Sequence, residues 1–350
     1  METPRQNHPL GDEVSTSVAS EMERQQIPAL SLAVLRSGKL LFAQDYGLAN
    51  LEQGIKASEQ TVYGLASISK TFTATALMLL IAEGQCRLDD GVRIYLPEVP
   101  STWNSITLRH LLSHTSGLPF QVRFEQYRLC EKFIYRLDVT RDEFLQSAVQ
   151  VPLDFAPGTQ TQYSNTGYFL LGIIIERISG MSCSEWLTLR IFRPLSMAST
   201  RIDDPAAIIP YRAAGYGLEA GGLQNADFTS SHWYAALNSL VSSVRDMARW
   251  DAALTSEQVL SGSFLRQMWE PTLLADGKSA EFGLAWKVEQ HESGKLVSHT
   301  GGGPRCSCYH ARFLDAQMSI IILANRGGAQ LRDLGNAIAD RFFRSEARTE

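Results

Sequence analysis

Three short stretches of this sequence combine side chains that could carry out nucleophilic chemistry. In the first, Ser67 is followed by Lys70 at the start of an apolar segment. Residues three apart in a helical turn share a face, so the Lys70 amine can reach the Ser67 hydroxyl and accept its proton. Amide groups at a helix start also point toward that serine and can stabilise an oxyanion. The alternative is a capping serine followed by a lysine that extends toward water.

The second stretch holds Tyr163 and Asn165, in the single Tyr-x-Asn sequence among the 11 tyrosines. Tyr163 could accept the serine proton if a nearby cation stabilises its phenolate, because its ordinary pKa is about 10. Asn165 could donate a hydrogen bond to a substrate carbonyl. The alternative is a loop tyrosine followed by a helix-capping asparagine.

The third stretch, residues 299–303, reads His-Thr-Gly-Gly-Gly at the end of a predicted strand. Glycines lack a Cβ, so a ligand can lie against this strand edge, and a backbone N–H there can complete an oxyanion hole. The alternative is a flexible turn after the strand. His110 and His114 have the spacing of a zinc pair, but no glutamate lies between them, and a structural role is favoured. We therefore expect no metal site.

Composition limits the class of protein. The chain has 350 residues, a formal net charge of −5, 44% hydrophobic residues and 20% charged residues. These values are typical of a globular chain. The negative net charge argues against a strongly basic nucleic-acid binder and gives no reason to expect binding to an anionic membrane. Five cysteines imply no disulfide framework. Because the first residues also lack the apolar run of a secretory signal, we expect a cytoplasmic protein, unless a signal segment has been removed.

The helices and strands that must position these residues can be predicted from the spacing of apolar side chains. Apolar spacing predicts helices at 11–26, 70–84, 107–112, 141–149, 166–180, 183–191, 244–254 and 331–343. It predicts strands at 30–35, 40–43, 283–288, 295–299, 306–313 and 318–323. Strands near both ends with helices between them predict an α+β fold. Its antiparallel sheet is built from both termini and flanked by helices, with a mostly helical insertion.

The three stretches, in this order, resemble the serine β-lactamase-like superfamily: class C β-lactamases, DD-peptidases of the same branch and family VIII carboxylesterases. The resemblance runs from about residue 27 to residue 325, and segments 65–72, 107–118, 244–250 and 282–286 are also similar to family blocks. It implies a β-lactamase/transpeptidase-like fold. We expect an α/β domain from residues 10–72 and 225–345, a mostly helical domain from 73–224, and an active site between them.

The resemblance also implies a role for individual residues. Ser67 would be the acylated nucleophile. Lys70 would lower the pKa of Tyr163, share its proton or act as the base itself. Tyr163 would be the general base in acylation and would then activate water. Asn165 would bind the substrate carbonyl, and Gln121 would lie near the acyl side chain.

The strand-end stretch contributes the remaining expected substrate-binding residues. The backbone N–H groups of Ser67 and Gly302 would form the oxyanion hole, with Gly301 beside them. His299 takes the place where class C β-lactamases carry a lysine. Histidine is largely neutral at pH 7, which weakens the case for a dedicated β-lactamase and fits an esterase.

We therefore expect a serine hydrolase that cleaves small carboxylic esters through an acyl-enzyme, with no metal or organic cofactor. Weak β-lactam hydrolysis is compatible with this interpretation. The alternatives are a D-amino-acid peptidase, DD-peptidase or β-lactamase acting on an amide, a biosynthetic acyltransferase, and a non-catalytic binding protein. The expected partner is a small ester or amide substrate rather than a nucleic acid or a membrane, and the sequence leaves the oligomeric state open. Substrate selection would depend on loops at 120–133 and 214–233.

Overall fold

The computed structural model describes residues 8–121, 140–226 and 239–346. The expected substrate-selecting loops therefore lie partly outside the described residues, at 122–133 and 227–233. In the described part, a seven-stranded antiparallel sheet has the order β3-β2-β1-β12-β11-β10-β9. Its strands are β1 (Ala29–Arg36), β2 (Lys39–Asn50), β3 (Ile55–Lys56), β9 (Lys287–His291), β10 (Gly294–Gly302), β11 (Ser307–Phe313) and β12 (Met318–Ala324).

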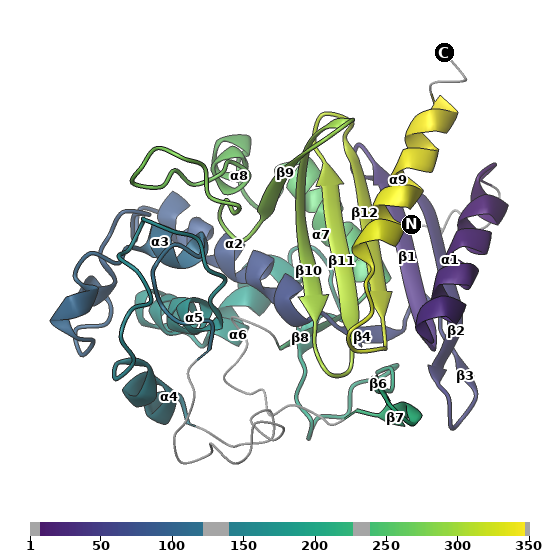
Figure 1. Cartoon of the computed structure of the whole chain (residues 1–350), viewed down its shortest axis with the longest axis horizontal. Coiled ribbons are helices and arrows are strands. Elements are labelled where there is room, and N and C mark those ends of the chain that lie inside the picture. The colour runs from purple at the N-terminus through teal and green to yellow at the C-terminus, as the bar shows by residue number, and fades with distance from the viewer. Residues whose placement is uncertain (1–7, 122–139, 227–238, 347–350) are drawn as a thin grey trace.

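The two ends of the chain meet in the middle of this sheet. β1 pairs antiparallel with β12, with Leu30 opposite Ala324 and Arg36 opposite Met318. This pairing confirms the prediction of an α+β fold whose sheet is built from both ends of the sequence. Figure 1 shows the purple N-terminal strands beside the yellow-green C-terminal strands.

The centre of the sheet is buried on both faces because β1 and β12 carry apolar side chains at nearly every position. In β1, Leu30, Leu32 and Val34 face one layer, and Ala33 and Leu35 face the other, as the two-residue period of a strand requires. The first face is covered by α1 (Gly11–Gln25) and α9 (Arg332–Glu346), which lie side by side in Figure 1. The opposite face packs on α7 (Val244–Thr255).

The remaining helices lie beside the sheet, on the side of β10 and β9 (Figure 1). They are α2 (Ser69–Ala82), α3 (Leu108–Leu112), α4 (Arg141–Ala148), α5 (Asn165–Ser179), α6 (Cys183–Leu187) and α8 (Gly262–Met268). Helix α2 is buried along most of its length and packs on α5 and α6. Burial on all sides is the arrangement expected of a helix that is apolar nearly all round.

The described residues also form two small sheets. One has the order β4-β8-β5, with β4 (Val62–Gly64), β8 (Leu240–Ser243) and β5 (Arg201–Ile202). The other pairs β6 (Tyr216–Glu219) with β7 (Gly222–Asn225). Neither sheet was predicted, because strands of two to four residues are too short to show a period. Among the described residues, no helix is both long and apolar enough to cross a membrane.

One predicted strand was placed too early in the sequence. The prediction was residues 283–288, whereas β9 is Lys287–His291. The Gly283 N–H donates to the Trp286 carbonyl oxygen, and the Ala285 N–H donates to the carbonyl oxygen of Leu112, the last residue of α3. Ala285 adopts a left-handed φ of 74°. The segment before β9 is an apolar turn that packs between the sheet and the helices. A short apolar run in a buried turn has the same sequence pattern as a short buried strand, so the pattern alone cannot distinguish them.

Candidate active site

The nucleophile candidate lies in a short 3₁₀ turn, η1 (Ala66–Ile68), that leads directly into α2. Side chains three residues apart eclipse each other in a 3₁₀ helix. Lys70 Nζ accordingly donates to Ser67 Oγ at 3.2 Å. Ala66, just before the serine, has φ 44°, a left-handed conformation that is costly for a residue with a Cβ. The surrounding structure therefore holds Ser67 on a sharp, strained turn.

The strands around this turn explain how it keeps its shape. The Leu65 N–H donates to the Leu240 carbonyl oxygen at 2.8 Å, and the Leu240 N–H donates to Ser69 Oγ at 3.2 Å. From the other side, Cys308 Sγ donates to the Gly64 carbonyl oxygen at 3.0 Å. Two strands, β8 and β11, thus fix the backbone on both sides of Ser67.

Lys70 is fully buried, so its side chain does not extend toward water. Its Nζ lies 5.0 Å from the centre of the Tyr163 ring and 5.6 Å from the centre of the Tyr168 ring. Burial holds the pKa of Lys70 well below its ordinary value, because the charged ammonium loses its hydration. A neutral amine within hydrogen-bonding distance of Ser67 can accept the serine proton.

Tyr163 lies two residues before Asn165, the first residue of α5. Burial raises the pKa of Tyr163, and the nearby Ser67 side chain lowers it in part. A raised pKa keeps the phenol protonated at neutral pH. Of the alternatives that the sequence left open, these two pKa directions favour the one in which Lys70 acts as the base itself over the one in which Tyr163 is the general base.

His299 lies on β10, opposite His310 on β11, and is 4% exposed. Its Nδ1 contacts the Thr300 carbonyl oxygen at 2.7 Å, which places the proton on Nδ1. Burial and the neighbouring Lys70 lower the pKa of His299 to about 3. The ring is therefore neutral at pH 7 and carries no fixed positive charge.

Several polar atoms at this point converge without a protein partner. Within the ranges that the structure describes, Tyr163 Oη, Asn165 Oδ1 and His299 Nε2 are buried and make no hydrogen bond. The Tyr163 and His299 ring centres are 6.2 Å apart. Buried polar groups are nearly always satisfied, so these atoms, two on the segment that begins α5 and one on β10, mark a place where polar groups of a ligand can bind.

The glycines of β10 approach the nucleophile turn closely. A Cβ on Gly301 would lie 2.3 Å from the Leu65 carbonyl oxygen, whereas nothing lies within 4 Å of a Cβ on Gly302. Gly301 is thus required for contact between the strand and the turn, and Gly302 borders open space. Gln121 is half-buried and follows Phe120, whose carbonyl oxygen accepts from the Asn165 N–H at 2.8 Å.

Sequence reasoning missed part of the aromatic surroundings. His114 stacks on Tyr163 with ring centres 4.3 Å apart, and its Nδ1 accepts from the Ser164 N–H at 3.0 Å. Phe282 lies 4.9 Å from His114 and 6.0 Å from Tyr163. His114 does not pair with His110, whose Nδ1 accepts from the Thr107 N–H. The only sequence signal for His114 and Phe282 was that they lie in segments 107–118 and 282–286, which resemble family blocks.

Comparison with known proteins identifies the family of this chain. The Beta-lactamase family model matches residues 14–342. The chain belongs to the beta-lactamase family. It is 30% identical to Penicillin-binding protein 4* of Bacillus subtilis (strain 168) over 323 residues, which cover 87% of this chain and 69% of that protein. It is 25% identical to Protein flp of Staphylococcus aureus (strain MW2), covering 89% of this chain and 62% of that protein.

A solved structure shows the same family fold. An octameric penicillin-binding protein homologue from Pyrococcus abyssi superposes with a TM-score of 0.78 at 26% identity, covering 91% of this chain and 74% of that one. This member of the beta-lactamase family thus has the serine-hydrolase fold of the penicillin-binding proteins, as its sequence motifs predicted.

Proposed function

We propose that this beta-lactamase family member hydrolyses small carboxylic esters through an acyl-enzyme on Ser67. Ser67 Oγ attacks the ester carbonyl carbon while its proton passes to Lys70. The alcohol leaves with a proton returned through Tyr163, and the acyl group stays on Ser67. Water then adds to the acyl carbonyl and gives a proton to Lys70 and Tyr163. This proton returns to Ser67 Oγ as the acid leaves. Backbone N–H groups of Ser67 and Gly302 would stabilise the oxyanion in both steps.

The neutral state of His299 is the observation that favours an ester over a β-lactam or a peptide as the substrate. A substrate with a carboxylate beside the scissile bond, such as a β-lactam or a peptide C-terminus, benefits from a fixed cation at this position. His299 is buried and its pKa is lowered to about 3, so it offers a neutral acceptor instead. An uncharged ester needs no such cation.

A peptidase of the same mechanism is the second candidate. It is favoured by the similarity to Penicillin-binding protein 4* and to the archaeal penicillin-binding protein homologue. Its substrate would be an amide or peptide ending in a D-amino acid, with the amine leaving in place of the alcohol. An acyltransferase differs only in that an alcohol or amine replaces water in the second step.

The test compares kcat/KM for p-nitrophenyl butyrate, nitrocefin and D-alanine p-nitroanilide, with Ser67→Ala as the inactive control. The ester should lead by at least a hundredfold, and Ser67→Ala should lose nearly all turnover while keeping the circular dichroism spectrum of the wild type. A leading anilide or nitrocefin would replace the esterase assignment with the peptidase or the β-lactamase. An active, folded Ser67→Ala variant would refute the acyl-enzyme itself.

A further inference from the structure

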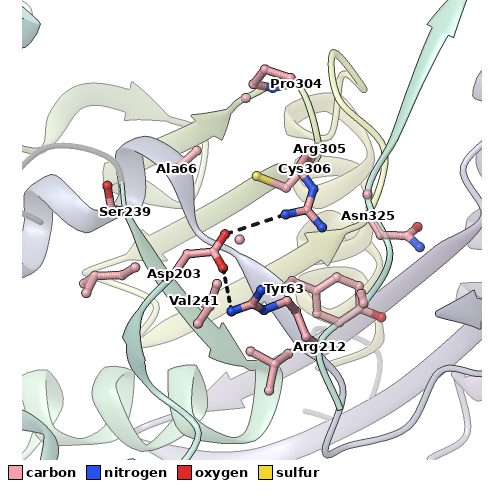
Figure 2. A pocket seen from close by; sticks show the side chains of 16 residues that line it. Tyr63, Ala66, Asp203, Arg212, Ser239, Val241, Pro304, Arg305, Cys306 and Asn325 are labelled. Carbon is pink, nitrogen blue, oxygen red and sulfur yellow. Dashed lines mark ion pairs between the residues drawn. The ribbon is translucent and has the colours of Figure 1, made fainter. Parts of the chain in front are cut away.

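A small cavity of about 50 Å³ lies behind the turn that carries Ser67. Ala66 lies in its wall, and Figure 2 shows Asp203 between Arg212 and Arg305. Arg212 Nη2 lies 3.4 Å from Asp203 Oδ1, and Arg305 Nη1 lies 3.9 Å from Asp203 Oδ2. These ion pairs join the segments that follow β5 and β10, so the backbone next to Ser67 is supported from behind.

Tyr163 has no comparable support through its own polar atom. Among the described residues, no hydrogen bond fixes its buried Oη, so the position of the phenol depends on what packs against its ring. The His114 ring lies closest, with centres 4.3 Å apart and planes 30° apart. The rings of Phe120, Phe282 and His299 are 6.0–6.2 Å away. The placement of the phenol therefore depends most on His114.

His114 also holds the backbone on both sides of Tyr163. Its carbonyl oxygen accepts from the Gln162 N–H at 2.9 Å. Its Nδ1 accepts from the Ser164 N–H at 3.0 Å. One residue thus contacts the tyrosine ring, the residue before it and the residue after it, which leaves the phenol little freedom to move.

The loop that carries His114 is unusual because it is polar, buried and strained. His114 has a left-handed φ of 60°, and His114, Ser113 and Thr115 are fully buried, although loops usually lie on the surface. The Gly158 N–H donates to the Thr115 carbonyl oxygen at 2.8 Å, which joins this loop to the segment that leads to Tyr163. Backbone strain of this kind persists only where the surrounding structure enforces it, and it concentrates at functional sites.

The chemistry of the ring argues for more than packing. Burial and the neighbouring Lys70 hold the pKa of His114 well below its ordinary value, so the ring is neutral at pH 7. Because Nδ1 accepts a hydrogen bond, the proton is on Nε2, which is buried without an acceptor among the described residues. A phenylalanine would fill the same space without this unpartnered donor. The contact that it could not make is the bond to Ser164.

We propose that His114 is a positioning residue that holds the Tyr163 phenol where it protonates the leaving group. The proposal rests on the proposed acyl transfer at Ser67. As the bond from the acyl carbon to the alcohol oxygen breaks, Tyr163 Oη gives its proton to that oxygen. The ammonium of Lys70, which took the proton of Ser67, then returns a proton to Tyr163. A shift of about 1 Å in a reacting group can lower the rate about a hundredfold.

The test uses two esters with the same acyl group, ethyl butyrate and p-nitrophenyl butyrate. Ethoxide must be protonated as it leaves, whereas p-nitrophenolate leaves as a stable anion. The ratio of kcat/KM for ethyl butyrate to kcat/KM for p-nitrophenyl butyrate therefore reports proton delivery by Tyr163. Tyr163→Phe should lower this ratio at least tenfold and serves as the reference. A general loss of structure would slow both esters and leave the ratio unchanged.

Two variants separate the contacts of His114. His114→Asn keeps a side-chain acceptor for the Ser164 N–H and tolerates the left-handed backbone, but it removes the ring stack. It should lower the ratio at least tenfold. His114→Phe keeps the stack and removes the acceptor, and it should lower the ratio at least threefold. Adding His114→Asn to Tyr163→Phe should lower the ratio less than twofold further, because the group that His114 positions is already absent.

His110→Asn is the matched control. His110 Nδ1 also accepts a backbone N–H, that of Thr107 at 3.2 Å, and no ring contact joins His110 to Tyr163 in the described part of the chain. This variant should keep the ratio within twofold of the wild type.

The outcomes separate this role from the proposed function. A ratio that changes less than threefold in both His114 variants would overturn the role, as would failure of both variants to fold, which would assign His114 to stability alone. If the wild type hydrolyses neither ester, the esterase is refuted. The ratio is then measured between D-alanine p-nitroanilide and D-alanine p-nitrophenyl ester, whose leaving groups differ in the same way, and the same limits decide the role of His114.

Discussion

Replacing Lys70 by Met should make this protein inactive and more stable. The side chain is fully buried, and its Nζ donates a hydrogen bond to Ser67 Oγ. Losing that bond costs about 1 kcal/mol of unfolding free energy. Each unit by which burial depresses the pKa of the amine costs the native state about 1.4 kcal/mol. Because the pKa of Lys70 is held well below its ordinary value, removing the amine should be net stabilising near pH 7.

The sign of the pH dependence follows from the same depression of the pKa. Between the folded pKa and the ordinary value of 10.5, the unfolded chain binds a proton at Lys70 and the folded chain does not. The free energy of unfolding should therefore rise with pH through this window in the wild type. Lys70→Met should lose this contribution, so its advantage should be largest at low pH and shrink toward pH 10.5.

The assays are urea unfolding at several pH values and ester turnover. Turnover should fall about 10²–10⁴-fold, the usual contribution of a positioned general base. Lys39→Met is the matched control, because Lys39 is exposed at the start of β2 and should change neither turnover nor the pH slope. A Lys70→Met variant that is less stable than the wild type at pH 7, with an unchanged pH slope, would show that Lys70 is charged in the folded protein.

Three further variants test the site. His299→Lys should raise kcat/KM for nitrocefin relative to p-nitrophenyl butyrate about tenfold, because a hydrogen bond to a charged group contributes about 1.5–3 kcal/mol; a fall in that ratio would contradict it. His114→Phe keeps the ring stack but removes the acceptor of a buried N–H, so urea unfolding should show a loss of about 1–3 kcal/mol, and unchanged stability would argue against the bond. Gly301→Ala should lower kcat at least tenfold, since its Cβ would collide with the Leu65 carbonyl oxygen, whereas Gly302→Ala should stay within threefold; equal effects would remove the steric argument.

The sequence was sufficient for the long elements and for the order of the motifs. The apolar runs of α2 and β12 are long enough for the sequence to predict a helix and a strand. Ser67 and Lys70 are only three residues apart, so a single helical turn brings their side chains together. Local spacing determines such features, which is why they could be predicted.

Tertiary contacts determine the features that the sequence did not indicate. His114 reaches Tyr163 only because the loop after α3 packs under the start of α5, and no periodicity encodes that contact. The cavity at Asp203 and Arg305 joins residues about a hundred positions apart in the sequence. Both depend on how the chain closes around the sheet, which spacing within one segment cannot reveal.

The pairing of β1 with β12 has a consequence for the synthesis of the protein. Nearly three hundred residues separate the two strands, as Leu30 and Ala324 show, so this contact has a very high sequence separation. At about 5–20 residues per second, a ribosome needs roughly 15–60 s to make the intervening chain. During that time the edge of β1 that later pairs with β12 has no partner strand and is exposed to other nascent chains. We therefore expect the protein to fold after translation and to depend on chaperones that shield strand edges.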